Sequence, residues 1–276
     1  MTARVARRLG GQARRTKPVR RASAGLSATR AGAALAALLA AGAIYGVGAS
    51  AAFGFQHLAI EGTRFTSEAD LRRMLGVADG TNLFLLSTEA VEARIGSLTT
   101  VAAVDVEVRL PDTIRIAVTD RQAVMTWRVG ERAFLADAAG VLFAEVGAAD
   151  AGASAVPSID DRRAASAALG VGSVLAPVDL GAATRLGSLE PAQLGSTAVS
   201  FGVAITDEHG FVLRAEPDGW TAIFGFYTPS LRTPDLVPGQ VYLLSSLLQG
   251  RETQIQQVIL ASDTDGTYVP RATAAP

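Results

Sequence analysis

Residues 104–127 read VDVEVRLPDTIRIAVTDRQAVMTW, and this stretch decides the fold of the region around it. Apolar and charged side chains alternate along its first seven residues, and the alternation resumes after a Pro-Asp pair. A period of two with β-branched residues around such a pair predicts a β-hairpin. The two apolar sides share a face only if the turn holds an odd number of residues. We therefore expect the turn at 110–112, with Glu107 opposite Arg115, and a hairpin that covers a core on one side only.

The residues before the hairpin predict the elements that cover its apolar face. HLAIE (57–61) has the composition of a short strand. TSEADLRRMLG (66–76) predicts a helix, with Ser67 as its N-cap and Asp70 as the capping-box partner. STEAVEARIGSL (87–98) predicts a second helix with its apolar residues on one face. The expected order is β-α-α-β-β over about 65 residues, with two helices against a three-stranded sheet.

The N-terminal part of the chain predicts a membrane anchor. Residues 1–30 contain nine Arg or Lys and no acid, and residues 31–55 carry no charge. As a helix, this uncharged run would be about 37 Å long at about 1.5 Å per residue. That length crosses a hydrocarbon core about 30 Å thick with some tilt. Because basic residues beside a span stay in the cytoplasm, we expect a cytoplasmic arm at 1–30, a transmembrane helix at 31–55 and extracytoplasmic domains after it. The expected location is the cell membrane, as a single-pass type II protein.

Three other interpretations of this N-terminal part stay open. Ala49-Ser50-Ala51 resembles a signal-peptide cleavage site, which would release the rest of the chain. A buried, alanine-rich helix of a soluble protein is the second. The basic arm could also bind nucleic acid, but it has no aromatic residues for base stacking, so no nucleic-acid partner is expected. Its simpler roles are to set the topology and to attract anionic lipid heads.

The second half of the chain predicts a mixed, mostly antiparallel β-domain at 122–270, followed by a disordered tail at 271–276. Trp127 and Trp220 are interpreted as core or strand anchors, and the run Asp160–Arg163 as a solvated loop. The expected elements are two strand-turn-strand units (133–143 and 211–225), an irregular segment (147–175), a helix broken near Gly187 (177–195), an amphipathic helix (241–250) and a last strand (254–261). The chain is thus expected to have an α+β fold after its single transmembrane helix.

The residues that carry chemistry are sparse. The chain has no cysteine, which excludes disulfides and thiolate-bound zinc, and only two histidines, His57 and His209. No nucleophile-base set or phosphate loop can be assembled from local spacing. We therefore expect no catalytic residue, no cofactor, no metal and no small-molecule substrate.

The run from Leu58 to Trp127 resembles the bacterial division protein family FtsQ, also called DivIB. The resemblance rests on IEGTRFTSEADL, LGVADGTNLFLL, RLPDTIRIAVTDR and AVMTW, and it continues in weaker form to about residue 270. The chain has Asp120-Arg121 where the family usually has Glu-Arg, and Gln240 or Arg232 near a position where the family tends to have Lys. The resemblance implies a POTRA domain at 57–121, an FtsQ-type β-domain and a bitopic scaffold of the division complex. It also implies partners of the FtsB/FtsL type, which are small bitopic division proteins.

The end of the chain predicts the partner site. The last strand of a sheet has one unpaired edge unless something covers it, and Val258 and Leu260 are expected to face the core. In the resembled family this terminal edge receives a partner strand. The alternative is that Tyr268 only closes the core. The residues expected to bind an FtsB-like segment are Gln257, Ile259, Ala261, Gly266, Thr267 and Tyr268.

Two other classes of function remain as alternatives. A POTRA-containing component of envelope protein transport or assembly would carry repeated POTRA units or a β-barrel. A secreted envelope-binding protein would follow from cleavage after the apolar run.

Overall fold

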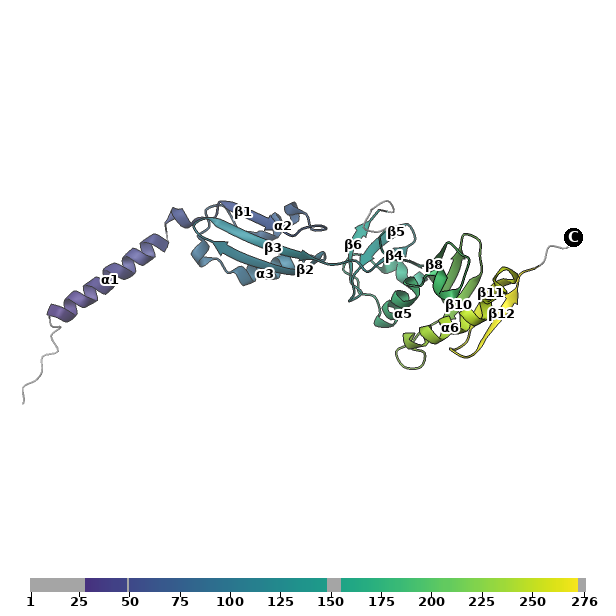
Figure 1. Cartoon of the computed structure of the whole chain (residues 1–276). Coiled ribbons are helices and arrows are strands. Elements are labelled where there is room, and N and C mark those ends of the chain that lie inside the picture. Colours follow the sequence, from purple (N-terminus) through teal and green to yellow (C-terminus); the bar gives the residue numbers. More distant parts are fainter. Residues whose placement is uncertain (1–27, 49, 148–154, 273–276) are drawn as a thin grey trace, which may run out of the picture. The chain divides into compact units, whose positions relative to one another are not determined.

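A computed structural model of the chain describes residues 28–48, 50–147 and 155–272 (Figure 1). It contains two units, residues 1–50 and residues 51–276, and each is described by itself. The basic arm up to residue 27 and the tail from residue 273 lie outside the described residues.

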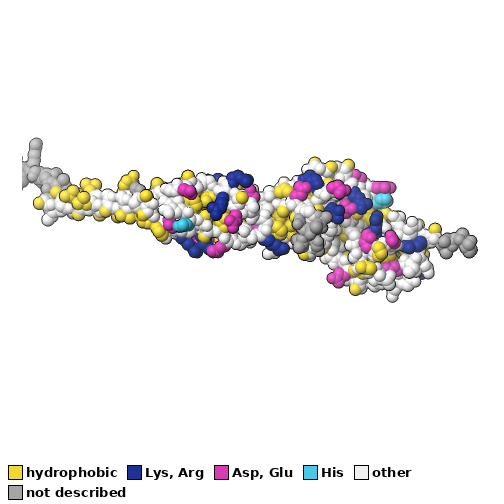
Figure 2. All heavy atoms as spheres, turned by 90° about the horizontal axis from the view of Figure 1, so that it is seen from above, with side chains coloured by type: hydrophobic (Ala, Val, Ile, Leu, Met, Phe, Trp, Pro, Cys, Tyr) yellow, Lys and Arg dark blue, Asp and Glu magenta, His cyan; other side chains and the backbone are white. Residues whose placement is uncertain are grey.

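The first unit is the helix α1 (Ala28–Gly48). It is the one helix in the described residues that is long and apolar enough to cross a membrane, by length and composition. Figure 2 shows hydrophobic side chains along it, whereas charged side chains of both signs are interspersed over the second unit. The helix differs from the expected span of 31–55, because it begins earlier and ends at Gly48. Phe55 extends the apolar run in the sequence, but its side chain is buried in the core of the second unit.

The β-α-α-β-β domain forms as expected from residue 57 onward. Its strands make a three-stranded sheet in the order β1-β3-β2, with β1 parallel and β2 antiparallel to β3. Glu107 pairs with Arg115 and Arg109 with Thr113, so the predicted three-residue turn and register are confirmed. The elements are β1 (His57–Glu61), α2 (Glu68–Leu75), a 3-10 turn (Leu83–Leu85), α3 (Thr88–Gly96), β2 (Val101–Arg109) and β3 (Thr113–Asp120).

One face of this sheet packs on the two helices. Ile114 and Ile116 of β3 are fully buried together with Leu71 of α2 and Ile95 of α3. The predicted N-cap of α2 is confirmed, since the Ser67 hydroxyl accepts the backbone N–H of Asp70 at 3.1 Å. The Asp70 carboxylate accepts the Ser67 hydroxyl at 2.6 Å, which is not the bond to the Ser67 backbone N–H that a capping box requires. The opposite face of the sheet carries charged side chains, which explains why apolar and charged residues alternate in the hairpin sequence.

The second domain of this unit is built on a nine-stranded sheet in the order β12-β11-β10-β9-β8-β7-β4-β5-β6. Five of its neighbouring pairs are antiparallel, and three, β4–β7, β7–β8 and β10–β11, are parallel. The mixed, mostly antiparallel domain is therefore confirmed. Its strands are β4 (Met125–Val129), β5 (Arg132–Ala136), β6 (Leu142–Val146), β7 (Ser158–Asp161), β8 (Ser200–Thr206), β9 (Gly210–Glu216), β10 (Thr221–Gly225), β11 (Ile255–Leu260) and β12 (Gly266–Pro270).

Two helices, α5 (Pro177–Gly187) and α6 (Val237–Leu248), pack on this sheet (Figure 1). Short 3-10 turns occupy 164–168, 191–194, 234–236 and 252–254. Trp127 and Trp220 are buried in the core beneath the helices, as predicted. Both indole N–H groups are satisfied by carboxylates, from Asp161 and Glu252 respectively.

The interpretation of Asp160–Arg163 as a solvated loop is wrong. Asp160 and Asp161 end the strand β7, which lies inside the sheet between β4 and β8. The side chain of Asp161 is fully enclosed, and its carboxylate accepts hydrogen bonds from Arg163, Ser166 and Trp127. The alternation that buries Ile159 also buries Asp161, because side chains two residues apart in a strand share a face.

Asp120, the last residue of β3, and the adjacent Arg121 hold the linker between the two domains in place by hydrogen bonds. The Asp120 carboxylate accepts the Thr66 hydroxyl and the backbone N–H groups of residues 64–66. Arg121 donates to the carbonyl of Thr99 and to the carboxylate of Asp137. Only four residues, 121–124, separate β3 from β4.

Candidate partner-binding edge

The structure places the free edge of the sheet on β12. The sequence placed it on 257–261, and this is corrected because β11 is paired on both sides, with β10 in parallel and with β12 in antiparallel orientation. Among the described residues, no strand pairs with the outer side of β12, which ends the nine-stranded sheet. A strand of five residues that includes Pro270 gives little signal in the sequence.

The six predicted residues therefore fall into three positions. Gly266, Thr267 and Tyr268 lie in the edge strand β12 itself. Gln257 and Ile259 lie one strand inside the edge, in β11. Ala261 follows β11 in the turn, where its carbonyl accepts a hydrogen bond from Arg232. The backbone of β12 can meet a partner strand, whereas residues of β11 can contribute only side chains to such a contact.

The two faces of the edge are distinguished by the register. Tyr268 lies opposite Val258, which is fully buried, so the two side chains share the face that packs on α6. Thr267 lies opposite Ile259 on the other face, and Ile259 is exposed there. The side chain of Tyr268 remains 40% exposed. It therefore extends the core face to the rim of the sheet without being enclosed by it.

Gly266 marks the close approach of α6 to the edge. A Cβ atom on this residue would lie 3.2 Å from the Leu243 Cδ2 atom and 3.3 Å from the Ile259 carbonyl oxygen. Those distances are tighter than ordinary van der Waals contacts. The contact shows that Leu243 of α6 borders the edge strand on the same face as Tyr268.

Two polar side chains, Arg232 and Gln240, fix the strands behind the edge. Each donates to the carbonyls of Phe224 and Leu260, which lie near the ends of the parallel strands β10 and β11. Gln240 is fully buried and accepts the Tyr227 hydroxyl at 2.7 Å. Burial raises the pKa of the Tyr227 phenol, which keeps it protonated as a donor. The sequence assigned neither residue a role. For Gln240, the signal that could have found it is an amide side chain one helical turn from the apolar residues Val237 and Leu244.

The opposite edge of the sheet, on β6, is partly covered. Leu142 donates its N–H to the carbonyl of Ser173, and Gly172 donates to the carbonyl of Leu142, both within 2.9 Å. Residues 172–175 thus cover the start of the β6 edge. On the outer side of β12, by contrast, no further strand or segment of the described chain is paired.

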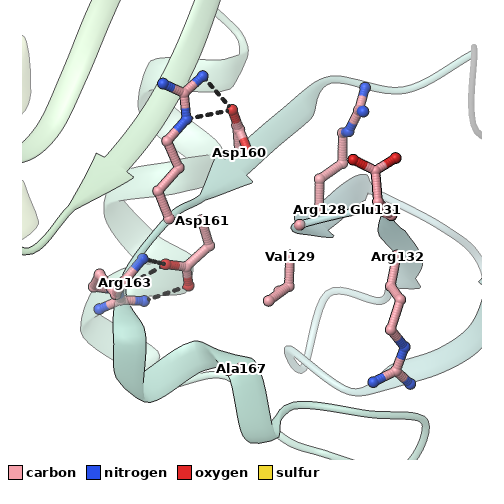
Figure 3. A pocket seen from close by; sticks show the side chains of 10 residues that line it. Arg128, Val129, Glu131, Arg132, Asp160, Asp161, Arg163 and Ala167 are labelled. Carbon is pink, nitrogen blue, oxygen red and sulfur yellow. Dashed lines mark hydrogen bonds and ion pairs between the residues drawn. The ribbon is translucent and has the colours of Figure 1, made fainter.

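An open pocket lies where the β4–β5 turn meets the end of β7 (Figure 3). Arg163 contacts Asp161 at 2.8 Å and Asp179 at 2.8 Å, and Arg132 contacts Glu145 at 3.1 Å. Most of the arginine charge is therefore compensated by carboxylates. In the part of the chain that the structure describes, no group of three or more His, Cys, Asp or Glu side chains could hold a metal ion.

Comparison with known proteins identifies the first domain. Residues 53–121 match the family model of the POTRA domain, FtsQ-type. The match begins at Phe53, the last residue of a 3-10 turn (Ala51–Phe53) that precedes β1, and ends one residue after β3.

Three curated relatives are cell division proteins FtsQ. That of Streptomyces collinus is 34% identical over 137 residues, which cover 49% of this chain and 52% of the relative. That of Mycobacteroides abscessus is 31% identical over 85 residues, covering 31% and 27%. That of Rhizobium meliloti is 30% identical over 95 residues, covering 34% and 31%. The matches thus span between about a quarter and a half of the length of these relatives. With its apolar helix, its FtsQ-type POTRA domain and its sheet-rich second domain, the chain is similar to proteins of the FtsQ/DivIB family.

Proposed function

We propose that the chain is a non-enzymatic, single-pass membrane scaffold of the bacterial division complex. In this proposal it holds a strand of a partner division protein, of the FtsB/FtsL type, on the free edge of β12. The observation that carries the proposal is that β12 ends the nine-stranded sheet with no further strand beside it in the described residues. The curated relatives are all named as cell division proteins, which supports cell division as the process in which this chain acts.

A free edge offers a partner its backbone N–H and C=O groups. An added strand gains affinity from backbone hydrogen bonds and selectivity from pockets for alternate side chains. Natural sheets usually cover or charge such edges, because an open edge pairs with other chains. The exposed side chains of β12 are Thr267, Tyr268, Val269 and Pro270, none of which is charged.

The side chains beside the edge are apolar on one face and mixed on the other, where Thr267 and Gln257 accompany Ile259 and Val269. Tyr268 of β12 and Leu243 of α6 border one face, and Ile259 and Val269 lie on the other. Side chains of an added strand point alternately to these two faces. A partner segment with apolar side chains toward Tyr268 and Leu243, and a mixture of apolar and polar ones toward the other face, is therefore the best match.

The membrane orientation is part of the same proposal. The helix α1 supplies the span, and the basic arm before it favours a cytoplasmic N-terminus. A reporter that is active only outside the cytoplasm, fused at Pro276, is then expected to be active. Release of the protein into the medium with an N-terminus near residue 52 would instead identify a cleaved signal peptide.

Binding of the purified extracytoplasmic region to candidate partner ectodomains tests the site. Tyr268→Ala is expected to weaken binding at least tenfold, which is about 1.4 kcal/mol. Its melting temperature should change by no more than a few degrees, because the side chain is already partly exposed. Tyr242→Ala is the matched control, since Tyr242 of α6 is 80% exposed. Equal affinity of both variants, or loss of the fold in Tyr268→Ala, removes Tyr268 from the site.

A further inference from the structure

The POTRA domain exposes its large apolar side chains at one end. Between residues 51 and 121, all of which are described, three large apolar side chains are exposed: Phe84 at 53%, Leu85 at 85% and Leu110 at 49%. Phe84 and Leu85 lie in the 3-10 turn before α3, and Leu110 lies in the turn of the β2–β3 hairpin. These segments are far apart in the sequence, but both belong to the end of the domain where the chain arrives from α1.

Backbone hydrogen bonds hold both turns against the arriving chain. Phe55 donates its N–H to the Thr81 carbonyl at 2.9 Å, and Gly80 donates back to the Phe55 carbonyl at 2.8 Å. Gln56 donates to the Asp112 carbonyl at 2.9 Å. The segment 54–57 therefore joins the 80–85 turn on one side and the hairpin turn on the other.

Phe53 completes the group. Its ring packs edge-on against Phe84, with the ring centroids 4.9 Å apart. We call Phe53, Phe84, Leu85 and Leu110 the proximal rim. Uncharged, exposed residues, Ala51 and Ala52, precede it in the sequence.

The outward position of the rim is fixed by the local structure. Leu83 and Phe55 point into the domain core and are nearly fully buried. The side chain of Asn82 caps the 3-10 turn by accepting the N–H of Phe84 at 2.9 Å. With Leu83 held inside and the turn capped, the next two side chains must face outward. Large apolar side chains that are held outward in this way signal an interaction surface.

The covalent chain limits what can cover this surface. Five residues lead from Gly48, the last residue of α1, to Phe53. An extended chain advances at most about 3.6 Å per residue, so Phe53 is tethered within about 18 Å of the end of the helix. If α1 crosses a membrane, as the proposed function requires, the rim cannot leave the neighbourhood of the lipid surface.

We propose that the proximal rim inserts into the lipid interface beside the transmembrane helix, and so holds the POTRA domain against the membrane. Phe and Leu side chains are the ones that amphipathic elements bury at the boundary of headgroups and acyl chains. The charged neighbours, Asp79, Asp112 and Arg109, carry both signs and offer no net attraction to anionic headgroups. The contact therefore depends on apolar insertion and should persist at high salt.

The full-length protein in phosphatidylcholine vesicles tests this inference. Because the chain has no cysteine, single substitutions give unique sites for a fluorescent label. Leu85→Cys and Leu110→Cys report on the rim, and Thr119→Cys is the control. Thr119 is exposed near the far end of β3, about 20 Å from the hairpin turn at about 3.3 Å per residue. Leu38→Cys, in the middle of α1, reports on the anchor itself.

Nitroxide-labelled lipids are expected to quench the labels at 85 and 110 at least twofold more than the label at 119, at low and at high salt. Adding Phe84→Ser to the Leu85→Cys chain should reduce the quenching at 85. Equal quenching at 85, 110 and 119 overturns the inference, as does quenching that disappears in high salt. Absence of quenching at 38 would overturn the membrane anchor, whereas quenching at 38 without quenching at 85 overturns the rim alone.

Discussion

The two sheets of residues 51–276 differ in what lies along their edges. In the POTRA domain, β2 is an edge strand, and its Val106 N–H is taken up by the carboxylate of Glu92 from α3 at 3.1 Å. In the nine-stranded sheet, none of the hydrogen bonds among the described residues joins a side-chain carboxylate to a backbone N–H of β12. A carboxylate that occupies an edge N–H obstructs an incoming strand, so β12 is better suited to pairing than β2.

The interiors of the two domains differ as well. The POTRA core is apolar, and its ion pairs, such as Arg115 with Glu61 and Glu107, lie on the outer face of the sheet. The β-domain encloses a charge, because Asp161 lies inside the sheet and pairs with Arg163. A domain with an apolar core thus precedes one whose core also encloses an ion pair. Each difference can be tested by matched substitutions.

The largest effect is expected for a charge in the POTRA core. Ile116→Asp places an unpaired carboxylate among fully buried apolar side chains, and should cost more than about 4 kcal/mol of unfolding free energy. Tryptophan fluorescence would not report on the POTRA domain, because Trp127 and Trp220 both lie in the β-domain. Hydrogen exchange of residues 101–120 therefore measures the loss. The matched control is Ile259→Asp, on the exposed face of β11, with a cost under about 1 kcal/mol. Similar losses in both variants would show that the assignment of faces is wrong.

A smaller but still large loss is expected from the enclosed ion pair. Asp161→Asn leaves the Arg163 charge with Asp179 alone, and should cost about 3 kcal/mol, because removal of one partner of a buried pair leaves an uncompensated charge. Asp160→Asn is the control, since the neighbouring pair with Arg162 is more exposed, and it should cost under about 1 kcal/mol. Chemical denaturation followed by tryptophan fluorescence measures both. An unfolding free energy that is unchanged in Asp161→Asn would show that Asp161 and Arg163 do not form a stabilising buried ion pair.

The same carboxylate predicts an acid-sensitive β-domain. Burial by itself would raise the pKa of Asp161, but hydrogen bonds from Arg163 and Ser166 outweigh it and hold the pKa below its ordinary value. A depressed pKa contributes stability that is complete above the ordinary value of about 3.9, and that stability is lost as the pH falls through the folded-state pKa. Denaturation midpoints measured from pH 6 to pH 2 should therefore fall more steeply for the native chain than for Asp161→Asn. Parallel curves would assign the acid sensitivity to other groups.

The smallest effect concerns the blocked edge. Glu92→Ala removes the acceptor of the Val106 N–H, and should cost about 1 kcal/mol. Glu92→Gln retains a side-chain oxygen and should recover part of the loss. The alanine variant should also self-associate more than the native chain in sedimentation experiments, because its β2 edge is free. If its association is unchanged, edge protection in the POTRA domain does not depend on Glu92.

The sequence predicted the POTRA domain in detail because its signals are local. The hairpin register follows from an odd turn between two alternating strands, and the start of α2 follows from Ser67 and Asp70. In the second domain, short stretches of sequence determine less of the structure, because several strands pair with segments that are distant in the chain. The strand β7 has four residues, and both of its partners, β4 and β8, are parallel strands from distant segments.

The errors in the β-domain have the same origin. Asp160–Arg163 looks like a solvated run, because nothing in it shows that Trp127 and Arg163 will surround Asp161. The free edge was placed on 257–261, because β12 is short, polar at its start and ends in proline. The alternation of Val258 and Leu260 toward the core was predicted and is confirmed, but pairing on the far side of β11 depends on the turn at 261–265.

The parallel pairing of β1 with β3 has a mechanical consequence. The chain enters β1 at one end of the POTRA domain and leaves β3 at the other, four residues before β4. A pull between the apolar helix and the β-domain would therefore draw β1 and β3 in opposite directions along their common axis. The five paired residues would carry that load together in shear, rather than opening one after another. The central strand of the POTRA sheet is thus the element through which tension would pass from the apolar helix to the β-domain.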